Sequence, residues 1–325
     1  MNNKQTTRQR GAAMIIVLGL VALISTWAID ALYADNIALR RAENTDNALR
    51  AELASQSALI LASKILIDDQ AESQNDDLDE IWAQQATPFP IDNGLVQASI
   101  IDANRFLNLN DLVDKNGKAN IVFEKYVKRL FIQLDLNEGL VDALIDWMDR
   151  DGQVHGSAGA EDASYSNQDY HIKNARLDSW DELLLVRGFD AKIMARLSTA
   201  ASVHNVPPNG ITRININTAT AATLMALAAD MSLSDAEILI SERPFESVQQ
   251  ALQNRPWLAN MNQAYLSVAS DVFMVRTQAS FGRANLRELS MLQRQSNKIT
   301  MLSLQRSHDS DHFQVSRKSA AINGN

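Results

Sequence analysis

The hydrophobic pattern begins with an apolar run that is long enough to form a membrane-spanning helix. No charged side chain occurs from Gly11 to Ile29, and a helix needs about 20 apolar residues to cross the hydrocarbon core of a bilayer. Lys4, Arg8 and Arg10 precede the run, and no acidic residue does. By the positive-inside rule, this end stays in the cytoplasm and the rest of the chain is exported.

The helical pattern continues beyond the apolar run. Large apolar residues recur at intervals of four and seven, on one stripe of a helix: Leu49, Leu53, Ile60 and Ile67. No proline or glycine interrupts the chain from Val21 to Asp69. We predict one helix over residues 12–69, membrane-embedded over about 12–33, with an amphipathic second half that lies against a sheet. The alternative is a membrane helix followed by an independent coiled coil.

Two stretches with strand periodicity flank a long block with helical periodicity. Alternation over 96–100 predicts one strand, and a second strand is expected over 105–109. After the block, period two returns from Asp271, where one face carries Phe273, Val275, Thr277, Ala279 and Phe281. Within the block, the pattern predicts helices over parts of 110–206 and around 221–229, 234–241 and 248–254.

This order indicates an α+β fold, in which a long N-terminal hydrophobic helix packs on a small antiparallel sheet and a large all-α domain is inserted. The predicted boundaries are a leader over 1–11, the helix over 12–69, the first part of the α/β domain over 70–109, inserted helical units over 110–210 and 211–266, returning strands over 267–306, and a disordered tail over 307–325.

Composition narrows the chemistry available to this chain. It contains no cysteine, so disulfides and thiolate metal sites are excluded. Its formal net charge of −9 disfavours nucleic acid as a partner, because phosphate binding needs a basic face. No Gly-x-Ser-x-Gly or other nucleophile setting occurs, and we predict that the protein is not an enzyme.

The densest group of oxygen ligands lies between residues 146 and 162. Asp149 and Asp151 alternate, so both can face one ion, and Glu161 with Asp162 can return from the far side. Calcium takes six to eight oxygen ligands from such groups. The spacing is not that of an EF-hand, and an acidic solvated loop remains the alternative to a cation site.

The start of the chain resembles the processing site of type IV prepilins and of type II secretion pseudopilins. Gly11 follows a basic leader and directly precedes the apolar run, which is longer than the core of a secretory signal peptide. The resemblance implies that a prepilin peptidase cuts between Gly11 and Ala12 and methylates the new N-terminus. Most members carry a glutamate at the fifth position after the cut, whereas this chain has Ile16. A simple signal anchor is the alternative.

The missing glutamate is typical of the K-type minor pseudopilins of type II secretion, and further segments resemble that family in the same order. They are 144–149, 159–162, 183–188, 214–219 and 244–248. The resemblance implies a pilin-like domain with a helical insertion that binds one or two calcium ions, and it makes Asp149, Asp151, Glu161 and Asp162 the expected ligands.

The same resemblance implies a place and partners. The protein would be anchored in the inner membrane with a periplasmic domain, and would form the tip of a pseudopilus with the I and J minor pseudopilins. Secreted proteins are possible further partners. The competing hypothesis is a membrane-anchored DNA receptor, because 214–241 resembles a helix-hairpin-helix module, although its hairpin over 228–234 has no glycine and contains Asp230.

Overall fold

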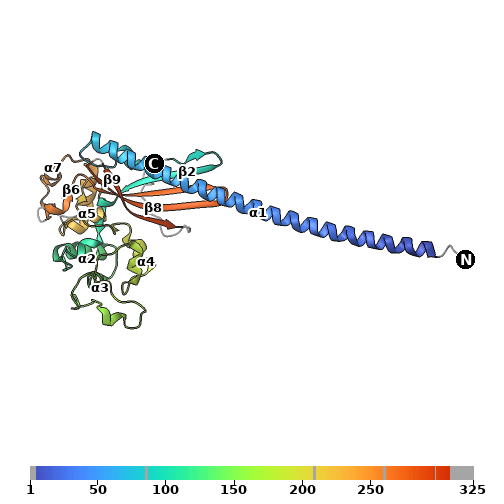
Figure 1. Cartoon of the computed structure of the whole chain (residues 1–325). Helices are drawn as coiled ribbons and strands as arrows, with labels where there is room; N and C mark the ends of the chain where they lie inside the picture. The colour runs from blue at the N-terminus through green and yellow to red at the C-terminus, as the bar shows by residue number, and fades with distance from the viewer. Residues whose placement is uncertain (1–4, 85–86, 208–209, 259–260, 297, 308–325) are drawn as a thin grey trace, which may run out of the picture.

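The computed structural model describes residues 5–84, 87–207, 210–258, 261–296 and 298–307, and its most extended element is one N-terminal helix (Figure 1). Helix α1 runs from Gln5 to Glu72. It is long and apolar enough to cross a membrane, and its most apolar window of 18 residues, none of it buried, has a mean hydropathy of 2.3. The predicted continuous helix is therefore present. Residues 1–4 of the predicted leader and 308–325 of the predicted tail lie outside the described residues.

The C-terminal part of α1 lies on a five-stranded antiparallel sheet with the order β1-β2-β7-β8-β9 (Figure 1). The strands are β1 (Phe89–Ile91), β2 (Gly94–Asp102), β7 (Val272–Phe281), β8 (Ala284–Gln295) and β9 (Lys298–Ser307). The alternation predicted for β7 is confirmed, because Phe273, Val275 and Ala279 are buried. Such alternation gives a strand one face for a core.

The helix packs on the sheet mostly through small residues, together with Leu66, which is fully buried. Ala51, Ala54 and Ala62 are each no more than 7% exposed, and Ala62 joins Phe273 and Val275 in one apolar cluster. The second half of the helix packs on the sheet as predicted, but the apolar stripe does not form most of this contact. Leu49, Leu53 and Ile60 point outward and are 53%, 53% and 70% exposed, while Ile67 is half-buried. Small side chains on the other side let the helix approach the large residues of β7 closely.

The helical block is an insertion between two neighbouring strands. β2 pairs with β7 over its whole length, from Gly94 with Phe281 to Asp102 with Phe273. The chain between them forms α2 (Ile121–Gln133), α3 (Gly139–Met148), α4 (Ala191–Leu197), α5 (Ala221–Leu227), α6 (Leu233–Ser241) and α7 (Val248–Leu252). The last three match the predicted helices to within two residues. The insertion has its own large apolar core.

Short pieces of extended chain tie the insertion together. β3 (Leu107–Asn108) pairs in parallel with β4 (Ala201–Ser202), and β5 (Ile214–Asn215) pairs in parallel with β6 (Leu266–Ser267). The second strand expected over 105–109 is therefore only two residues long and does not belong to the main sheet. The chain turns away at Asp102, whose side chain accepts a hydrogen bond from the amide of Asn104 and starts a short 3-10 helix instead.

Buried polar side chains hold the entry and exit of the insertion side by side. Asn104 accepts hydrogen bonds from the amides of Asp271 and Val272 at 3.2 and 2.9 Å, and it donates to the carbonyl of Arg213 at 2.7 Å. Buried polar groups need such partners. The amide side chain at this point therefore fixes the insertion to the edge from which β7 begins.

Candidate cation site and assembly surface

The loop that follows α3 folds back onto the end of that helix. Asp146 accepts a hydrogen bond from the amide of His155 at 2.8 Å, and Asp142 accepts from the amides of Ser157 and Ala158. At Gly159, a β-carbon would come within 2.4 Å of Asp146 Oδ2, so no larger residue fits there without a shift. The two helix carboxylates therefore act as acceptors around which the loop is wound.

Three carboxylates converge inside this loop. One oxygen from each of Asp149, Asp151 and Glu161 lies within 4.8 Å of the others. Asp149 and Glu161 are 3% and 8% exposed, while Asp151 is exposed. The buried oxygens Asp149 Oδ1, Glu161 Oε1 and Asp146 Oδ2 have no hydrogen-bond partner. Buried carboxylate oxygens without partners are costly, so the arrangement suits a cation.

The electrostatics of the loop agree with this reading. Burial, followed by the neighbouring charges of Asp151, Asp146 and Glu161, raises the pKa of Asp149 to about 7. Burial and then Asp146 raise the pKa of Glu161, and burial raises the pKa of Asp146. Like charges gathered at one place hold protons more tightly. A divalent cation would replace those protons as the balancing charge.

Two other carboxylate groups in the described residues are already balanced by basic side chains. Lys128 Nζ lies 2.7 Å from both Glu124 and Asp142. Arg294 pairs with Asp69 at 2.9 Å and also with Asp76. Among the described residues, no salt bridge joins Asp149, Asp151 or Glu161 to a base. These three therefore form the group that is left for an ion, and an all-oxygen donor set favours a hard cation such as calcium.

The structure brings together three of the four expected ligands and places a further carboxylate beside them. The predicted ligand Asp162 is not brought to the cluster, because its carboxylate lies against the ring of His171 at 2.9 Å. Asp146 lies beside the cluster instead. Its three-residue spacing from Asp149 places both on one side of the end of α3, which is a signal that the sequence carried. Asp114, considered for a second site, accepts the amides of a tight turn at 2.7 and 3.0 Å.

The outward side of α1 is a second candidate functional surface. From Met14 to Tyr33 the large apolar side chains of the helix are exposed, and the exposed stripe continues past this segment through Leu39, Leu49, Leu53 and Ile60. Gly11 and Ala12 lie within α1, and Ile16 is 63% exposed. Exposed apolar surface of this extent marks a membrane or protein contact.

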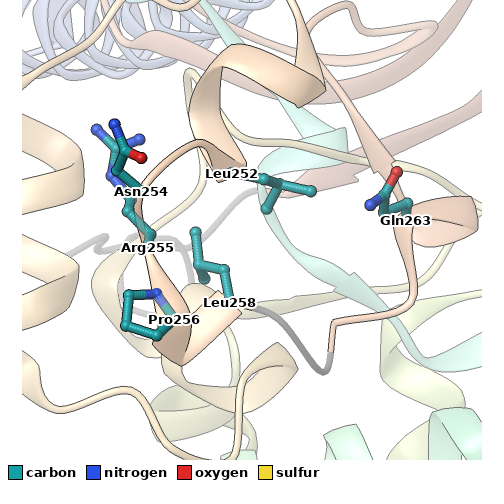
Figure 2. Close-up of a pocket in the computed structure, with 6 residues that line it drawn as sticks. All are labelled: Leu252, Asn254, Arg255, Pro256, Leu258 and Gln263. Atoms are coloured by element: carbon teal, nitrogen blue, oxygen red, sulfur yellow. The ribbon is translucent and has the colours of Figure 1, made fainter.

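A shallow hollow on the second helical unit is a weaker candidate. It is lined by Leu252, Asn254, Arg255, Pro256, Leu258 and Gln263 (Figure 2). The guanidinium of Arg255 is already satisfied, because it donates to the carbonyl of Ala251 at 2.7 Å, pairs with Glu242 and lies over the ring of Phe245. The hollow therefore presents no free charge to a ligand from this arginine.

Known protein families match the insertion. Residues 105–206 and 214–269 match two family models, both described as type II secretion system protein K. The second match includes the α5–α6 hairpin, the segment on which the competing DNA-receptor hypothesis depends. This hairpin carries an acidic capping box, in which Ser232 and Asp235 bond reciprocally.

Relatives that align with most of the chain carry the same description. Type II secretion system protein K of Aeromonas hydrophila is 32% identical over 91% of this chain and 96% of its own length. The protein of the same description from Klebsiella pneumoniae is 31% identical over 89% and 93%. The crystal structure of the GspK-GspI-GspJ complex from enterotoxigenic Escherichia coli contains a chain with a TM-score of 0.70 and 25% identity, which covers 83% of this chain and 100% of that one.

Proposed function

Since this chain belongs to the family of type II secretion system protein K, the minor pseudopilins of that system, we propose that it forms the tip of a periplasmic pseudopilus and takes part in the export of folded proteins across the outer membrane. Its role is structural and not enzymatic. The protein is held in the inner membrane by α1, and the sheet with its helical insertion lies in the periplasm. Secreted proteins are the cargo that the assembly moves.

The outward stripe of α1 is the observation that carries this proposal. Leu49, Leu53 and Ile60 are exposed beyond the segment that a bilayer covers, on the side of the helix that faces away from the sheet. A membrane accounts for the exposed residues up to about Tyr33, since a helix rises 1.5 Å per residue. It does not account for the others. Apolar helices of neighbouring subunits would cover them, as in a filament whose first helices pack side by side.

The partners that we propose are the I and J minor pseudopilins of the same secretion system. The similar chain of known structure was solved in a complex with GspI and GspJ. That chain covers 83% of the present chain at 25% identity, which supports a similar mode of assembly. Binding is expected through the outward stripe of α1 and through the adjacent head. The head is the sheet together with its helical insertion.

Processing at Gly11 makes the helix available for assembly. We propose that prepilin peptidase removes residues 1–11 and leaves Ala12 as a methylated N-terminus. Ile16 then stands where other subunits carry a glutamate for the amine of a neighbour. A buried ammonium needs a carboxylate partner. A subunit that offers none fits the position beyond which no further subunit is added.

Replacement of Gly11 by tryptophan tests the processing step. The leader should remain attached, which electrophoresis detects as a slower band, and secretion should stop. Gly19→Ala is the matched control, because Gly19 lies in the same helix and a β-carbon there meets no atom within 4 Å. That control should be processed and should support secretion. Normal processing of the Gly11 variant would refute the assignment of the cleavage site.

Calcium binding by the loop after α3 is the second part of the proposal. Asp149, Asp151 and Glu161 would supply the carboxylates, with Asp146 beside them, and calcium would fix the loop against the end of α3. Ligand that binds only the folded state raises its stability, by about 2.7 kcal/mol at a free concentration 100 times the Kd. A chelator should therefore lower the melting temperature, and an unchanged melting curve would remove calcium from the proposal.

A further inference from the structure

A cavity of ≈ 370 Å³ lies between the sheet and the insertion, on the face of the sheet that α1 does not cover. The sheet contributes alternate residues whose neighbours face α1, namely Met274 and Arg276 of β7 and Leu289 and Met291 of β8. The insertion contributes Arg105, Trp180, Thr199 and Ser202, among others. A volume of this size is within the range of small-molecule sites.

Two polar groups in the wall of this cavity lack partners. Ser202 is 4% exposed, and its hydroxyl makes no hydrogen bond. Arg105 Nε is also buried without a partner, and among the described residues no salt bridge includes Arg105. Its guanidinium lies over the ring of Phe106 at 5.4 Å, and its burial lowers its pKa. A buried guanidinium nitrogen and a buried hydroxyl without partners are unusual in a folded protein.

The charge around the cavity favours an anion. Burial and the neighbouring charge of Arg105 lower the pKa of Arg243 to about 10, so a second guanidinium adds to the positive potential. Asp102, the carboxylate near Arg105, already accepts a hydrogen bond from Ser270 at 2.6 Å. The carboxylate of Asp178 at the rim is 89% exposed and pairs with Lys173 at 2.8 Å.

We propose that this cavity binds an organic carboxylate with a small apolar body. A guanidinium presents a planar fork of donors that matches a carboxylate, and the Ser202 hydroxyl supplies a further donor. The apolar body would lie against Met274, Leu289 and Met291. An inorganic phosphate has no apolar body to cover these three side chains, so the cavity favours the organic acid. The ligand would be either a free short-chain acid or the C-terminal carboxylate of an apolar peptide.

Ligand binding in this cavity does not require the assembly with the I and J subunits proposed above. The cavity joins β7 and β8 to the segment that includes β4, so an occupant would touch both parts of the head at once. Its binding would therefore hold the insertion at a fixed position on the sheet. The site would be available in the single chain, and a binding measurement without the I and J subunits is sufficient to detect it.

The test is fluorine NMR on the full chain in lipid nanodiscs, with 6,6,6-trifluorohexanoate as the probe and empty nanodiscs as the reference. We expect broadening of the probe signal by the protein, at least tenfold weaker binding to Arg105→Gln, and no competition by 6,6,6-trifluorohexanol. Arg196→Gln is the matched control, because Arg196 lies on the surface of α4 and pairs with exposed Asp135. It should bind the probe as the unmodified chain does.

A second variant keeps the test decisive if Arg105→Gln unfolds. Thr199 lies exposed at the edge of the cavity, so Thr199→Trp narrows the entrance without a change in the core. It should reduce probe binding by a similar factor while the melting temperature stays constant. Equal probe binding by Arg105→Gln or Thr199→Trp and the unmodified chain, or equal competition by the alcohol, would overturn the proposal.

Competition separates the two sources of the carboxylate. Acetyl-Ala-Leu-Phe with a free C-terminus should displace the probe if the natural ligand is a peptide end, and its C-terminal amide should not. If neither peptide displaces a probe that binds through Arg105, the site is specific for free acids. Displacement by the amide as strongly as by the acid would contradict the role of the carboxylate.

Discussion

The two long faces of α1 differ in the size of their apolar residues. One face packs on the sheet and stabilises the head, and the other is exposed and free to bind partner subunits. The face on the sheet carries small residues such as Ala51 and Ala62, which are 1% and 2% exposed. The opposite face carries Leu53 and Ile60, which are 53% and 70% exposed. A helix that exposes large apolar residues such as Leu53 and Ile60 on the side away from its own sheet needs a second apolar surface to cover them.

The buried carboxylates also fall into two kinds: those that are paired with a base inside the chain and those that are not. Asp69 and Asp76 are matched inside the chain by Arg294, and Asp142 by Lys128. The cluster after α3 has no such base among the described residues. A third solution occurs at Asp111, where burial raises the pKa to about 7, so that a proton balances the group. Internal bases, protons and external cations are thus three ways to accommodate a buried acid, and each responds to a different experiment.

The largest effect is expected on the outward face of α1. The double substitution Leu53→Glu and Ile60→Glu places charges where partner helices should pack, and we expect at least a hundredfold loss of affinity for the I and J subunits, or about 3 kcal/mol. Stability of the head should change little, because both positions are exposed. Co-purification from membranes, followed by a binding titration, measures the loss.

The matched control for this substitution is Leu61→Glu. Leu61 is 61% exposed but lies on a different side of the helix from Leu53 and Ile60. It should leave complex formation intact. If Leu61→Glu and the double variant weakened the complex equally, binding of the I and J subunits would not depend specifically on the stripe.

The pH dependence of stability should reveal the carboxylate that a proton balances. Asp111 is 1% exposed, and its pKa is about 7 in the folded state against 3.8 as the ordinary value. The folded state therefore keeps a proton that the unfolded chain releases, and this group lowers the free energy of unfolding as pH rises from about 4 to 7. At 1.36 kcal/mol per pKa unit, the contribution is on the order of 4 kcal/mol.

Asp111→Asn should remove this part of the slope in urea titrations recorded at several pH values. An asparagine oxygen can still accept the amide of Thr212, which lies 3.3 Å from the carboxylate of Asp111. Asp114→Asn is the control, because backbone amides of its turn, that of Lys118 first, lower the pKa of Asp114, and a group with a lowered pKa causes no loss of stability as pH rises. An unchanged slope in Asp111→Asn would show that the group is ionised in the folded protein.

Removal of calcium should separate the acidic cluster from the balanced ones. Excess chelator should lower the melting temperature by about 5–10 °C, which corresponds to roughly 3 kcal/mol for a head of this size. Asp149→Asn should abolish the difference between calcium and chelator. In chelator near pH 8, the same variant should be at least as stable as the unmodified head, because it lacks a charge that burial and its neighbours disfavour.

Glu124→Gln is the contrasting variant in the balanced group. The substitution leaves His155 without its carboxylate partner and Lys128 with Asp142 alone, so the head should be less stable with or without calcium. The calcium response itself should persist. If the calcium response disappeared in Glu124→Gln and survived in Asp149→Asn, the ion would bind at the Glu124 group and not at the Asp149 cluster.

The smallest effect belongs to the inward face of α1. Ala62→Leu adds volume where Phe273 and Val275 already pack, and overpacking of a core costs about 1–3 kcal/mol. Urea unfolding should show this loss, while affinity for the I and J subunits stays constant. A stable Ala62→Leu head that had lost its partners would reverse the assignment of the two faces.

Periodicity in the sequence was sufficient to predict the helix, the long strands and the insertion between them. It could not predict which surface covers the stripe of Leu49, Leu53 and Ile60, because a period gives the spacing of a face and not its partner. The alternation around Phe273 predicted the buried face of β7 correctly, because this strand lies between β2 and β8 and one of its faces is covered by α1. The small residues Ala51 and Ala62 gave the stronger clue to close packing on the sheet.

The same limit applies to the site residues. Asp149, Asp151 and Glu161 are close in the chain and the loop brings them together, whereas Asp162 turns toward His171, a contact set by the path of the loop. The pairing of Arg294 with Asp76 spans more than 200 residues, and no local pattern contains it. The cavity beside Arg105 likewise forms only when β7 and β8 meet the insertion.

Cross-linking from single cysteines tests the central claim most directly, because the chain has no cysteine of its own. Cysteine would replace Leu53, Ile60 or Leu61 in turn, in cells that also produce the I and J subunits. We predict cross-links to a partner helix from positions 53 and 60, and few from 61, which lies on a different side of the helix. Equal cross-linking from all three positions, or none from 53 and 60 in cells that secrete normally, would contradict the account.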